Sequence, residues 1–512
     1  MLDKRIVRVC ALLAVTAAAL AGCSSTAASS PKAGGGGGQV TIALGADPSG
    51  LDPQAYEDGN AVAVYDNIAE QLIFTDAKTN ALEPGLATAW KYMDDHTLRL
   101  TLRPNVKFSN GEPFNADSVV YSVKRVTSPN YKTQQSSFFG GINDARRIDD
   151  LTVDILSSKP DATMAQSLTL MFIVPPKYTK DHGDQYFNAQ PVGTGPYLFV
   201  NWTRGSSITL KANDTYWGGA PKIKNVKFAI MAESNVQLNA LKTGQIQLAT
   251  TLSPQTLSQA PQSFTVPGPD HPMIILNQRG GPFVDKNVRL AANYAVDRQA
   301  IVDKIYQGTA DVAGCQPFGP QTLGFNPTLQ NYTYDPQKAR ELLAASGNPT
   351  PSVTFIGEAG RWTNDLAAEQ AVQGYLQAVG FKVKFQSLAF ESFLQQLLPS
   401  GNNPSMARPD MLFTSTSDTT GDADQKLQTF YAAKASAGSL NDPVIFNLVA
   451  QQATITDRAQ RTKVQQEVLA RACSEADFIY LAANKNIYGA AKNLTWQPRY
   501  DTQILAKTMT LS

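Results

Sequence analysis

The stretch that decides the fold is PMIILNQRGGPFVDKNVRLAANYAVDRQAIVDKIYQGTADVA, residues 272–313. Residues 273–276 form a short apolar run, as expected of a buried strand, and the turn residues of 277–282 interrupt it. Asp285 then precedes apolar residues at helical spacing, so it is expected to cap a helix. A second helical pattern is expected to end at Gly308, where glycine suits a left-handed terminator. The stretch therefore predicts a strand, a glycine-rich turn and two consecutive helices.

The overall composition is typical of a folded protein with a mixed surface. At 512 residues, the length suggests about three domains. Charged residues make up 17% and hydrophobic residues 43%, which argues against a disordered chain. The formal net charge is +1, and residues 1–22 alone carry an excess of two positive charges, which leaves about −1 for the remainder. No block of like charge occurs, so nucleic acid is not an expected partner.

The first 38 residues indicate export and anchoring. Basic residues precede an apolar run at 9–20 that is too short to cross a bilayer but suits a signal peptide. The run leads into Leu20-Ala21-Gly22-Cys23, which resembles a bacterial lipobox, in which the cysteine is lipid-modified and becomes the N-terminal residue. Residues 23–38, ending in five glycines, would then be a flexible tether. The alternative is ordinary secretion with a chance cysteine. We expect a protein anchored through Cys23 on the outer side of the cytoplasmic membrane.

The cysteines point to one disulfide. Cys10 would leave with the signal peptide and Cys23 would carry lipid. Cys315 and Cys473 remain, in an oxidising compartment. We expect these two to be bonded; the alternative is two separate buried thiols.

Patterns elsewhere predict further elements. Residues 39–44 alternate polar and apolar, as in a strand, and residues 61–72 carry apolar residues at helical spacing. Residues 148–156 are expected to form a strand. Strand-like and helix-like patterns then alternate to about residue 481, which favours an α/β fold with a mixed or parallel sheet.

Three segments of the first half carry recognisable motifs. Residues 86–126 predict two strands, a tight Asn110-Gly111 turn and a helix capped by Asn115. Residues 191–197, PVGTGPY, cannot form a phosphate-binding loop because no Gly-Lys-Ser/Thr follows. Residues 214–221, DTYWGGAP, predict a turn.

The ordered set of motifs resembles the family 5 extracellular solute-binding proteins of ABC importers, which include the oligopeptide-, dipeptide- and nickel-binding proteins. In the opening stretch the resemblance rests on Asn277, Pro282-Phe283, Asp285, Val288-Arg289, residues 291–295 and Asp297-Arg298. It implies a large, two-lobed, periplasmic-binding-protein-like α/β fold of the cluster C type with an extra inserted subdomain.

The resemblance also implies a domain arrangement. Residues 1–22 would be the signal peptide and 23–38 the tether. Lobe I would combine residues 39–80, 191–271 and 485–512, with an inserted subdomain at 81–190. Lobe II would be residues 272–484.

An enzyme is the main alternative from another class, and the sequence offers little for it. His96, His182 and His271 show no metal-ligand spacing, and no His-Glu-x-x-His or Gly-x-Ser-x-Gly motif occurs. We therefore name no catalytic residue and expect no metal and no cofactor.

A binding protein that closes on a peptide must instead match the charges of its ligand. A peptide carries an ammonium and a carboxylate, and each buried charge needs an opposite partner. For the ammonium the resemblance implies Asp418, which follows a strand-like run where the peptide binders of the family carry an aspartate. The tryptophan and proline that usually accompany it are absent here, as Thr416 and Ala423 show.

For the ligand's anionic end we expect Arg361, at the end of another strand. Its alternative roles are an ion pair with Glu358 or simple exposure to solvent. Trp362 is expected either to stack on the ligand or to pack in the core, and Tyr56 is a further aromatic candidate.

The function that the resemblance implies is capture of a small solute, with a short peptide as the first choice, for delivery to a membrane permease. Metal chelates, opines and oligosaccharides remain open as ligands, as does a role as a surface receptor or chaperone. The expected partners are the ligand, the permease subunits and the membrane, and the protein is expected to be a monomer.

Overall fold

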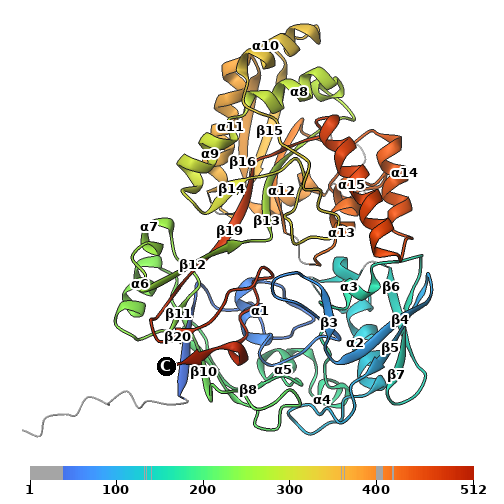
Figure 1. Cartoon of the computed structure of the whole chain (residues 1–512), viewed down its shortest axis with the longest axis vertical. Coiled ribbons are helices and arrows are strands. Elements are labelled where there is room, and N and C mark those ends of the chain that lie inside the picture. Colours follow the sequence, from blue (N-terminus) through green and yellow to red (C-terminus); the bar gives the residue numbers. More distant parts are fainter. Residues whose placement is uncertain are drawn as a thin grey trace, which may run out of the picture. The chain divides into compact units, whose positions relative to one another are not determined.

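The computed structural model describes residues 38–512, except for residues 132, 134, 140, 359, 363, 399–407, 418 and 419 and the side chains of 136, 137 and 391. The predicted signal peptide, Cys23 and nearly all of the tether lie outside the described residues, as does Asp418. Among the described helices, none combines the length and apolar character needed to cross a bilayer. Most strands belong to three sheets (Figure 1).

The largest sheet has eight strands, in the order β12-β19-β11-β1-β10-β9-β8, with β14 paired to β19 outside this path. β1 is parallel to both of its neighbours, and the other pairs are antiparallel. The strands are β1 (Gln39–Leu44), β8 (Tyr197–Thr203), β9 (Ser207–Ala212), β10 (Asn225–Ile230), β11 (Leu248–Ala249), β12 (Gln262–Pro267), β14 (Ala310–Val312) and β19 (Ala482–Ala490).

β1 occupies the middle of this sheet because both of its faces are apolar. Val40, Ile42 and Leu44 pack in one core with α1 (Gly59–Tyr65). Ala43, on the other face, packs in the core that contains α6 (Ser234–Lys242). A strand with parallel neighbours that is covered on both faces is expected to be almost continuously buried, as β1 is.

A separate antiparallel sheet has the order β4-β5-β7-β6. Its strands are β4 (Ala87–Asp94), β5 (Thr97–Leu102), β6 (Ile142–Arg147) and β7 (Thr152–Ser157), and α2 (Ala116–Thr127) packs on it. The Asn115 side chain caps α2 by accepting from the backbone N–H groups of Asp117, at 3.0 Å, and Ser118, at 3.3 Å. The cap predicted from the sequence is thus confirmed.

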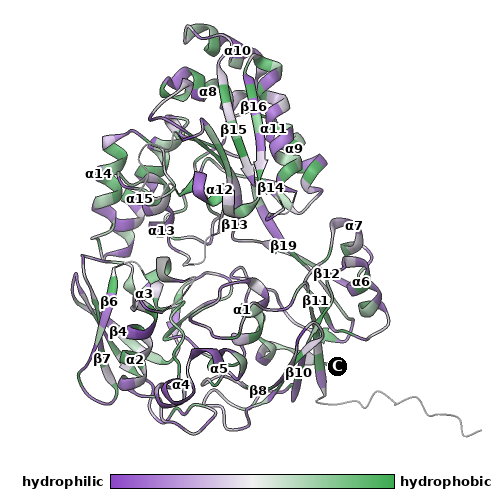
Figure 2. Cartoon of the chain, turned by 180° about the vertical axis from the view of Figure 1, so that it is seen from behind, coloured by the Kyte–Doolittle hydropathy of each residue, from purple (hydrophilic) through white to green (hydrophobic). Residues whose placement is uncertain are grey.

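The third sheet is mixed, in the order β16-β15-β17-β13-β18. Its strands are β13 (Asp270–Leu276), β15 (Ser352–Glu358), β16 (Lys382–Leu388), β17 (Met411–Ser417) and β18 (Phe478–Tyr480). One hydrophobic core joins it to α8 (Lys286–Ala295), α10 (Pro336–Ala345) and α11 (Asp365–Val379), and another joins it to α14 (Pro443–Gln452) and α15 (Arg458–Ser474). Figure 2 shows hydrophobic residues along these strands.

We call the eight-stranded sheet without β14, together with its helices, the first lobe. The four-stranded sheet with α2 is the subdomain, and the mixed sheet with its helices and β14 is the second lobe. The remaining elements are β2 (Ile73–Thr75), β3 (Leu82–Pro84), η1 (Ser136–Phe139), α3 (Met164–Ser167), α4 (Pro176–His182), α5 (Asp184–Ala189), α7 (Pro254–Leu257), η2 (Pro282–Val284), α9 (Arg298–Ile301), η3 (Val302–Tyr306), α12 (Phe390–Leu397), α13 (Asp424–Lys426), η4 (Leu427–Tyr431), β20 (Leu494–Thr495), η5 (Ala506–Thr508) and β21 (Thr510–Leu511).

The stretch at 272–313 folds largely as predicted. Asp285 caps α8 by accepting from the N–H of Asn287 at 2.7 Å. The second helical segment begins as α9 and continues as the π-helical turn η3. It ends one residue earlier than predicted, because Gln307 already has a left-handed φ of 49°, followed by Gly308 at 89°.

The helix predicted at 61–72 is wrong in its second half, since α1 ends at Tyr65. The carbonyl oxygens of Asn67 and Ile68 accept from the N–H groups of Tyr197 and Gly195, both at 2.9 Å. Helical continuation would need those carbonyls for residues farther along the helix, so tertiary hydrogen bonding overrides the apolar spacing.

The strand predicted at 148–156 is also too long at its start. Its first residues form the turn between β6 and β7, where the Asp149 side chain accepts from the N–H of Leu151 at 2.9 Å. Aspartate favours turns because its side chain bonds the backbone two residues ahead.

The two lobes are joined by chain crossings at β12–β13 and at β19. Residues 262–267 of β12 pair with residues 485–490 of β19, in the first lobe. Residues 482–484, at the start of the same strand, pair with β14, whose chain neighbours belong to the second lobe. Only Gly268 and Pro269 separate β12 from β13. β19 therefore carries hydrogen bonds to both lobes.

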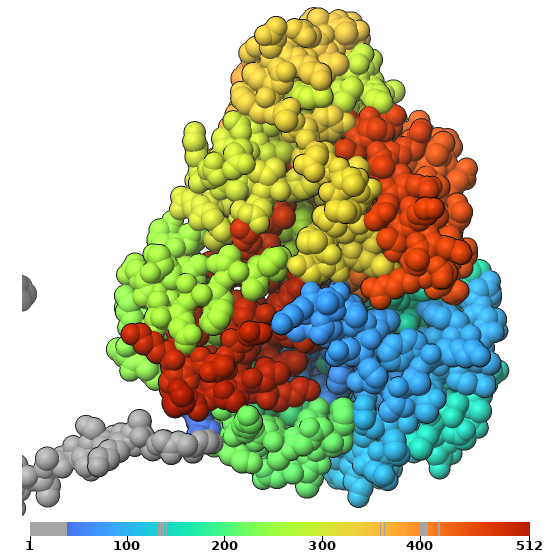
Figure 3. Space-filling view, in the orientation of Figure 1, coloured from blue at the N-terminus to red at the C-terminus, as the bar shows by residue number. Residues whose placement is uncertain are grey.

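Further contacts connect the second lobe to the rest of the chain. Arg461 of α15 donates to the carbonyl oxygen of Ala162 at 2.6 Å and to Asp422 at 2.5 Å. Asn80, in the loop between β2 and β3, donates to the carbonyl oxygen of Gln321 at 3.5 Å. Figure 3 shows the blue segment of this loop against the yellow segment of the second lobe.

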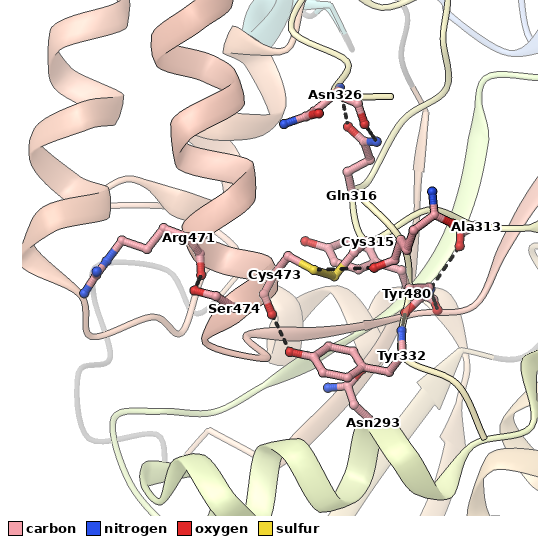
Figure 4. Close-up of a disulfide and its surroundings, with 12 residues drawn as sticks. Asn293, Ala313, Cys315, Gln316, Asn326, Tyr332, Arg471, Cys473, Ser474 and Tyr480 are labelled. Atoms are coloured by element: carbon pink, nitrogen blue, oxygen red, sulfur yellow. Dashed lines mark hydrogen bonds between the residues drawn. A yellow bond between two sulfur atoms is a disulfide. The ribbon is translucent and has the colours of Figure 1, made fainter. Parts of the chain in front are cut away.

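Cys315 and Cys473 form a disulfide, with an S–S distance of 2.19 Å (Figure 4). It joins the segment after β14 to the last turn of α15. The Tyr332 hydroxyl donates to the carbonyl oxygen of Cys473 at 2.5 Å, and Gln316 donates to the carbonyl oxygen of Asn326 at 2.8 Å. The bond therefore fixes a long loop to the helix that covers one face of the mixed sheet.

We expect the disulfide to stabilise the second lobe. It closes a loop of about 158 residues, for which the chain-entropy account gives about 4 to 5 kcal/mol. The double variant Cys315→Ala/Cys473→Ala should melt at a lower temperature than the wild type in calorimetry. Reductant should lower the melting temperature of the wild type and leave that of the variant unchanged. Two titratable thiols in denatured, unreduced mature protein would contradict the pairing.

Candidate functional site

Four charged side chains from both lobes lie within electrostatic range along the lobe boundary. Glu57 lies in the loop before α1, Asp270 is the first residue of β13, Arg361 follows β15, and Lys426 ends α13. Arg361 and Lys426 both act electrostatically on Glu57 and on Asp270. We call these four residues the charged cluster. It contains two acids and two bases, so it can face both ends of a zwitterion.

At both acids of the cluster, the effect of burial on the pKa is larger than the opposing effect of the cations. Desolvation raises the pKa of the Glu57 carboxyl, although Arg361 and Lys426 oppose the shift. Desolvation likewise raises the pKa of Asp270, against the same two cations and a hydrogen bond from the Ser417 hydroxyl. A raised pKa means that the ionised form is under-stabilised. An additional positive group at this place would therefore be favourable.

Arg361 is positioned by the turn after a parallel strand, where α/β proteins commonly hold ligands. The backbone N–H of Arg361 donates to the Asp365 carboxylate at 2.9 Å. The guanidinium lies 4.0 Å from the centroid of the Phe390 ring and forms an ion pair with Glu358 at 3.7 Å. The ion pair that was one alternative role is thus present. Because 40% of the side chain is exposed, it remains accessible to a ligand.

The loop that carries Glu57 is stabilised by contacts with a buried arginine. Arg125, on α2, forms an ion pair with Asp52 and donates to Gln54 at 2.8 Å. Gln135 donates to the carbonyl oxygen of Tyr56 at 2.9 Å. These contacts therefore fix the part of the loop that immediately precedes Glu57.

Three cavities lie along the boundary. One of about 160 Å³ has Glu57 and Pro269 among its lining residues. A second, of about 640 Å³, is lined by Asp270 and by residues 484–488 of the crossing strand. A third, of about 430 Å³, lies between the subdomain and residues 420–429 of the second lobe. The charged cluster contributes to the first two.

Residues 81–438 match the family model of bacterial extracellular solute-binding proteins, family 5 (middle region). The chain belongs to family 5 of the bacterial extracellular solute-binding proteins.

Known relatives of this solute-binding protein match along nearly its whole length. The glutathione-binding protein GsiB of Pectobacterium atrosepticum is 26% identical over 469 residues, covering 89% of this chain and 90% of the relative. HbpA2 of Haemophilus parasuis superposes with a TM-score of 0.82 at 23% identity, over 93% of this chain and all of that one. The periplasmic binding protein DppA of Helicobacter pylori, in complex with the peptide STSA, gives 0.73 at 24% identity, over 93% and 98%. The two-lobed α/β fold expected from the sequence is confirmed.

The remaining residues predicted for the solute-binding site have different surroundings. Trp362 packs against the core of the second lobe, and its indole N–H donates to Glu358 at 3.3 Å. Tyr56 is half-buried and packs in a small first-lobe core with Tyr65 and Phe172. Asp418 lies outside the described residues; its neighbour Ser417 bonds Asp270 of the charged cluster.

The three histidines of this solute-binding protein lie in separate elements. His96 follows β4, His182 ends α4, and His271 is in β13, where burial lowers its pKa to about 4. Within the part of the chain that the structure describes, no three His, Cys, Asp or Glu residues are grouped to hold a metal ion.

A pair of buried carboxyls lies behind Arg361. Glu369, on α11, accepts from the N–H of Glu358 at 2.9 Å. Burial, with a smaller contribution from the negative charges of Asp365 and Glu358, raises the pKa of Glu369 to about 7. Burial also raises the pKa of Glu358, which Arg361 opposes. The pair therefore changes charge close to neutral pH.

This solute-binding protein should lose stability as Glu369 ionises. Its pKa is higher in the folded state, about 7, than the ordinary value of 4.5, so folding stability falls as pH rises through that interval and stays lowered above it. Glu369→Gln should abolish the fall, with a gain approaching about 3 kcal/mol at pH 8 and little gain near pH 4.5.

Urea unfolding at several pH values measures this effect. Glu341→Gln, which removes an exposed glutamate of α10, is the matched control and should follow the wild-type pH profile. A gain for Glu369→Gln that does not depend on pH would contradict the assignment.

Reasoning from the sequence missed Glu57, Asp270 and Lys426. Glu57 precedes Asp58, the N-cap of α1, and nothing in the pattern separates the two acids. Asp270 precedes a strand and Lys426 lies on a single helical turn. Their shared role depends on long-range packing, which neither motif nor spacing reports.

Proposed function

We propose that this protein captures a small zwitterionic solute, with a short peptide as the first choice, and delivers it to the permease of an ABC importer. The charged cluster carries the proposal, because its carboxylates and cations come from both lobes and lie within electrostatic range of one another. A peptide offers the complementary ammonium and carboxylate. The relative that binds glutathione and the structural neighbour in complex with STSA support the same ligand class.

The lobe division expected from the sequence supplies the proposed mechanism. Lobe I would comprise residues 39–80, 191–271 and 485–512, the inserted subdomain residues 81–190, and lobe II residues 272–484. The sheets described above support this division. A ligand that contacts both lobes favours their closed arrangement, with bending at the chain crossings. The closed form would dock on the permease, and a separate ATPase would supply energy.

Of the other ligands, an opine shares the pair of opposite charges and would use the same cluster. A neutral oligosaccharide would leave the cluster without a ligand partner. A surface receptor or chaperone would use the same cleft without transport.

The chain is further proposed to be a monomeric lipoprotein, anchored through Cys23. The lipobox-like sequence and the following tether support this proposal. Intact mass of detergent-extracted protein should exceed that of residues 23–512 by a diacylglyceryl group, with any further acyl chain. Cys23→Ser should yield unmodified protein that no longer partitions into detergent. A wild-type mass without lipid would contradict the anchor.

The charge assignment can be tested with tripeptides and their blocked forms, by calorimetric titration and thermal shift. A ligand at 100 times its Kd stabilises the folded state by about 2.7 kcal/mol. N-terminal acetylation should weaken binding at least tenfold, as should Glu57→Gln. C-terminal amidation and Arg361→Gln should each do the same.

Matched pairs identify each partner. The residue that binds the ammonium is the one whose variant has no further effect once the peptide is acetylated; Glu57, Asp270 and Asp418 are compared in this way. Arg361 and Lys426 are compared with amidated peptides. If acetylation and amidation both leave the affinity unchanged, the peptide assignment would stand, but the charged cluster would not be what recognises the peptide ends. No peptide binding would overturn the peptide assignment and direct the search to opines, sugars and chelates.

A further inference from the structure

Asp66, which directly follows α1, is a buried acid whose side chain has no hydrogen-bond partner among the described residues. Its relative exposure is 5%, and neither carboxylate oxygen has a partner among the described residues. Burial raises its pKa well above the usual range, and Asp501 adds to the rise. An unsatisfied buried carboxyl is costly, so its presence at a cavity needs an explanation.

The two cations that act electrostatically on Asp66, Arg499 and Lys507, are bound to other groups. The Arg499 guanidinium donates to Asp501 at 2.9 Å and to the carbonyl oxygen of Thr75 at 2.9 Å. The Lys507 ammonium donates to the Tyr216 hydroxyl at 3.3 Å. Both lower the pKa of Asp66 electrostatically, but burial prevails. The acid therefore has room for a positive partner that the described chain does not supply.

Asp66 lines the cavity of about 160 Å³ that has Glu57 at its edge. Apolar side chains line it as well, namely Val62, Tyr65, Leu170 and Phe172. At about 30 Å³ for each water molecule, the volume corresponds to about five waters, enough for one side chain. The cavity thus combines an apolar wall, a buried acid and a position next to the charged cluster.

We propose that this cavity is a specificity subsite for a cationic side chain of the ligand, with Asp66 as its counter-ion. The inference rests on the proposed function, in which the charged cluster holds the main-chain ends of a peptide. A lysine or arginine side chain has an apolar stem, which suits the wall, and a terminal donor, which suits the unpartnered oxygens. Ligand binding would then satisfy a group that is unsatisfied in the empty protein.

The test compares tripeptides that carry one lysine at each position in turn among alanines, each paired with its norleucine counterpart. Norleucine keeps the apolar stem and lacks the ammonium. The wild type should bind at least one lysine peptide tenfold or more tightly than its counterpart, which corresponds to about 1.4 kcal/mol. Arginine in place of lysine distinguishes an ammonium from a guanidinium.

Asp66→Asn should reduce the lysine-to-norleucine affinity ratio to below three. Asp214→Asn is the matched control, since it removes an exposed carboxylate from the same lobe, and it should keep the wild-type ratio. The wild-type comparison with norleucine needs no variant, so a folding defect in Asp66→Asn leaves the proposal testable.

The outcomes separate the two hypotheses. Equal affinity for lysine and norleucine peptides in the wild type, or an unchanged ratio in Asp66→Asn, overturns the subsite and leaves the peptide function standing. If no peptide binds, n-butylammonium and 1-butanol are the probes. A larger thermal shift with n-butylammonium, lost in Asp66→Asn, would support the cation subsite although the peptide function fails. Equal shifts would overturn both.

Discussion

The pairing of β19 with strands of both lobes is the constraint on which the site depends. One end of this strand bonds β14 and the other bonds β12, so a single strand ties the lobes together. The short Gly268-Pro269 segment between β12 and β13 is the other crossing. Asp270 follows that segment directly and belongs to the charged cluster.

Electrostatic compensation separates structural acids from acids available to a ligand. Asp52 is buried and has its partner in Arg125, and Asp422 is buried and has its partner in Arg461. These pairs hold a loop and a domain contact, and removing one partner would leave an uncompensated charge. Asp66 is as buried as these acids, but its oxygens have no such partner. The difference lies in hydrogen bonding, not in residue type or burial.

The sequence predicts those features of the fold that depend on neighbouring residues. The caps at Asn115 and Asp285 follow from side chains that bond the backbone two or three residues ahead, so local sequence suffices. The pairing of Cys315 with Cys473 followed from elimination among four cysteines. The end of α1 at Tyr65 was missed because Gly195 and Tyr197, far along the chain, take the carbonyls that a longer helix would use.

The site was less predictable for the same reason. Arg361 was predicted because it follows a strand, and the structure brings it near Glu57 and Asp270. Glu57 and Asp66 look like any other acids of the segment 57–66, because their burial is decided by residues from other parts of the chain. Trp362 packs against the second-lobe core, and its stacking on a ligand stays a prediction. Asp418 stays a prediction.

The composition of the charged cluster restricts which ligands it can bind favourably. Its two bases oppose the burial that raises the pKa of its two acids, but they do not outweigh it. Under the proposed function, a zwitterion brings an ammonium to the acids and a carboxylate to the bases and leaves the total charge unchanged. A ligand with a single charge would leave one residue of the opposite pair under-compensated in a partly desolvated place, which is costly. A cationic side chain adds one positive charge, and Asp66, which lies outside the cluster, is the acid that can balance it. If both proposals hold, charge balance links the cluster and the cavity lined by Glu57 and Asp66 into one recognition surface.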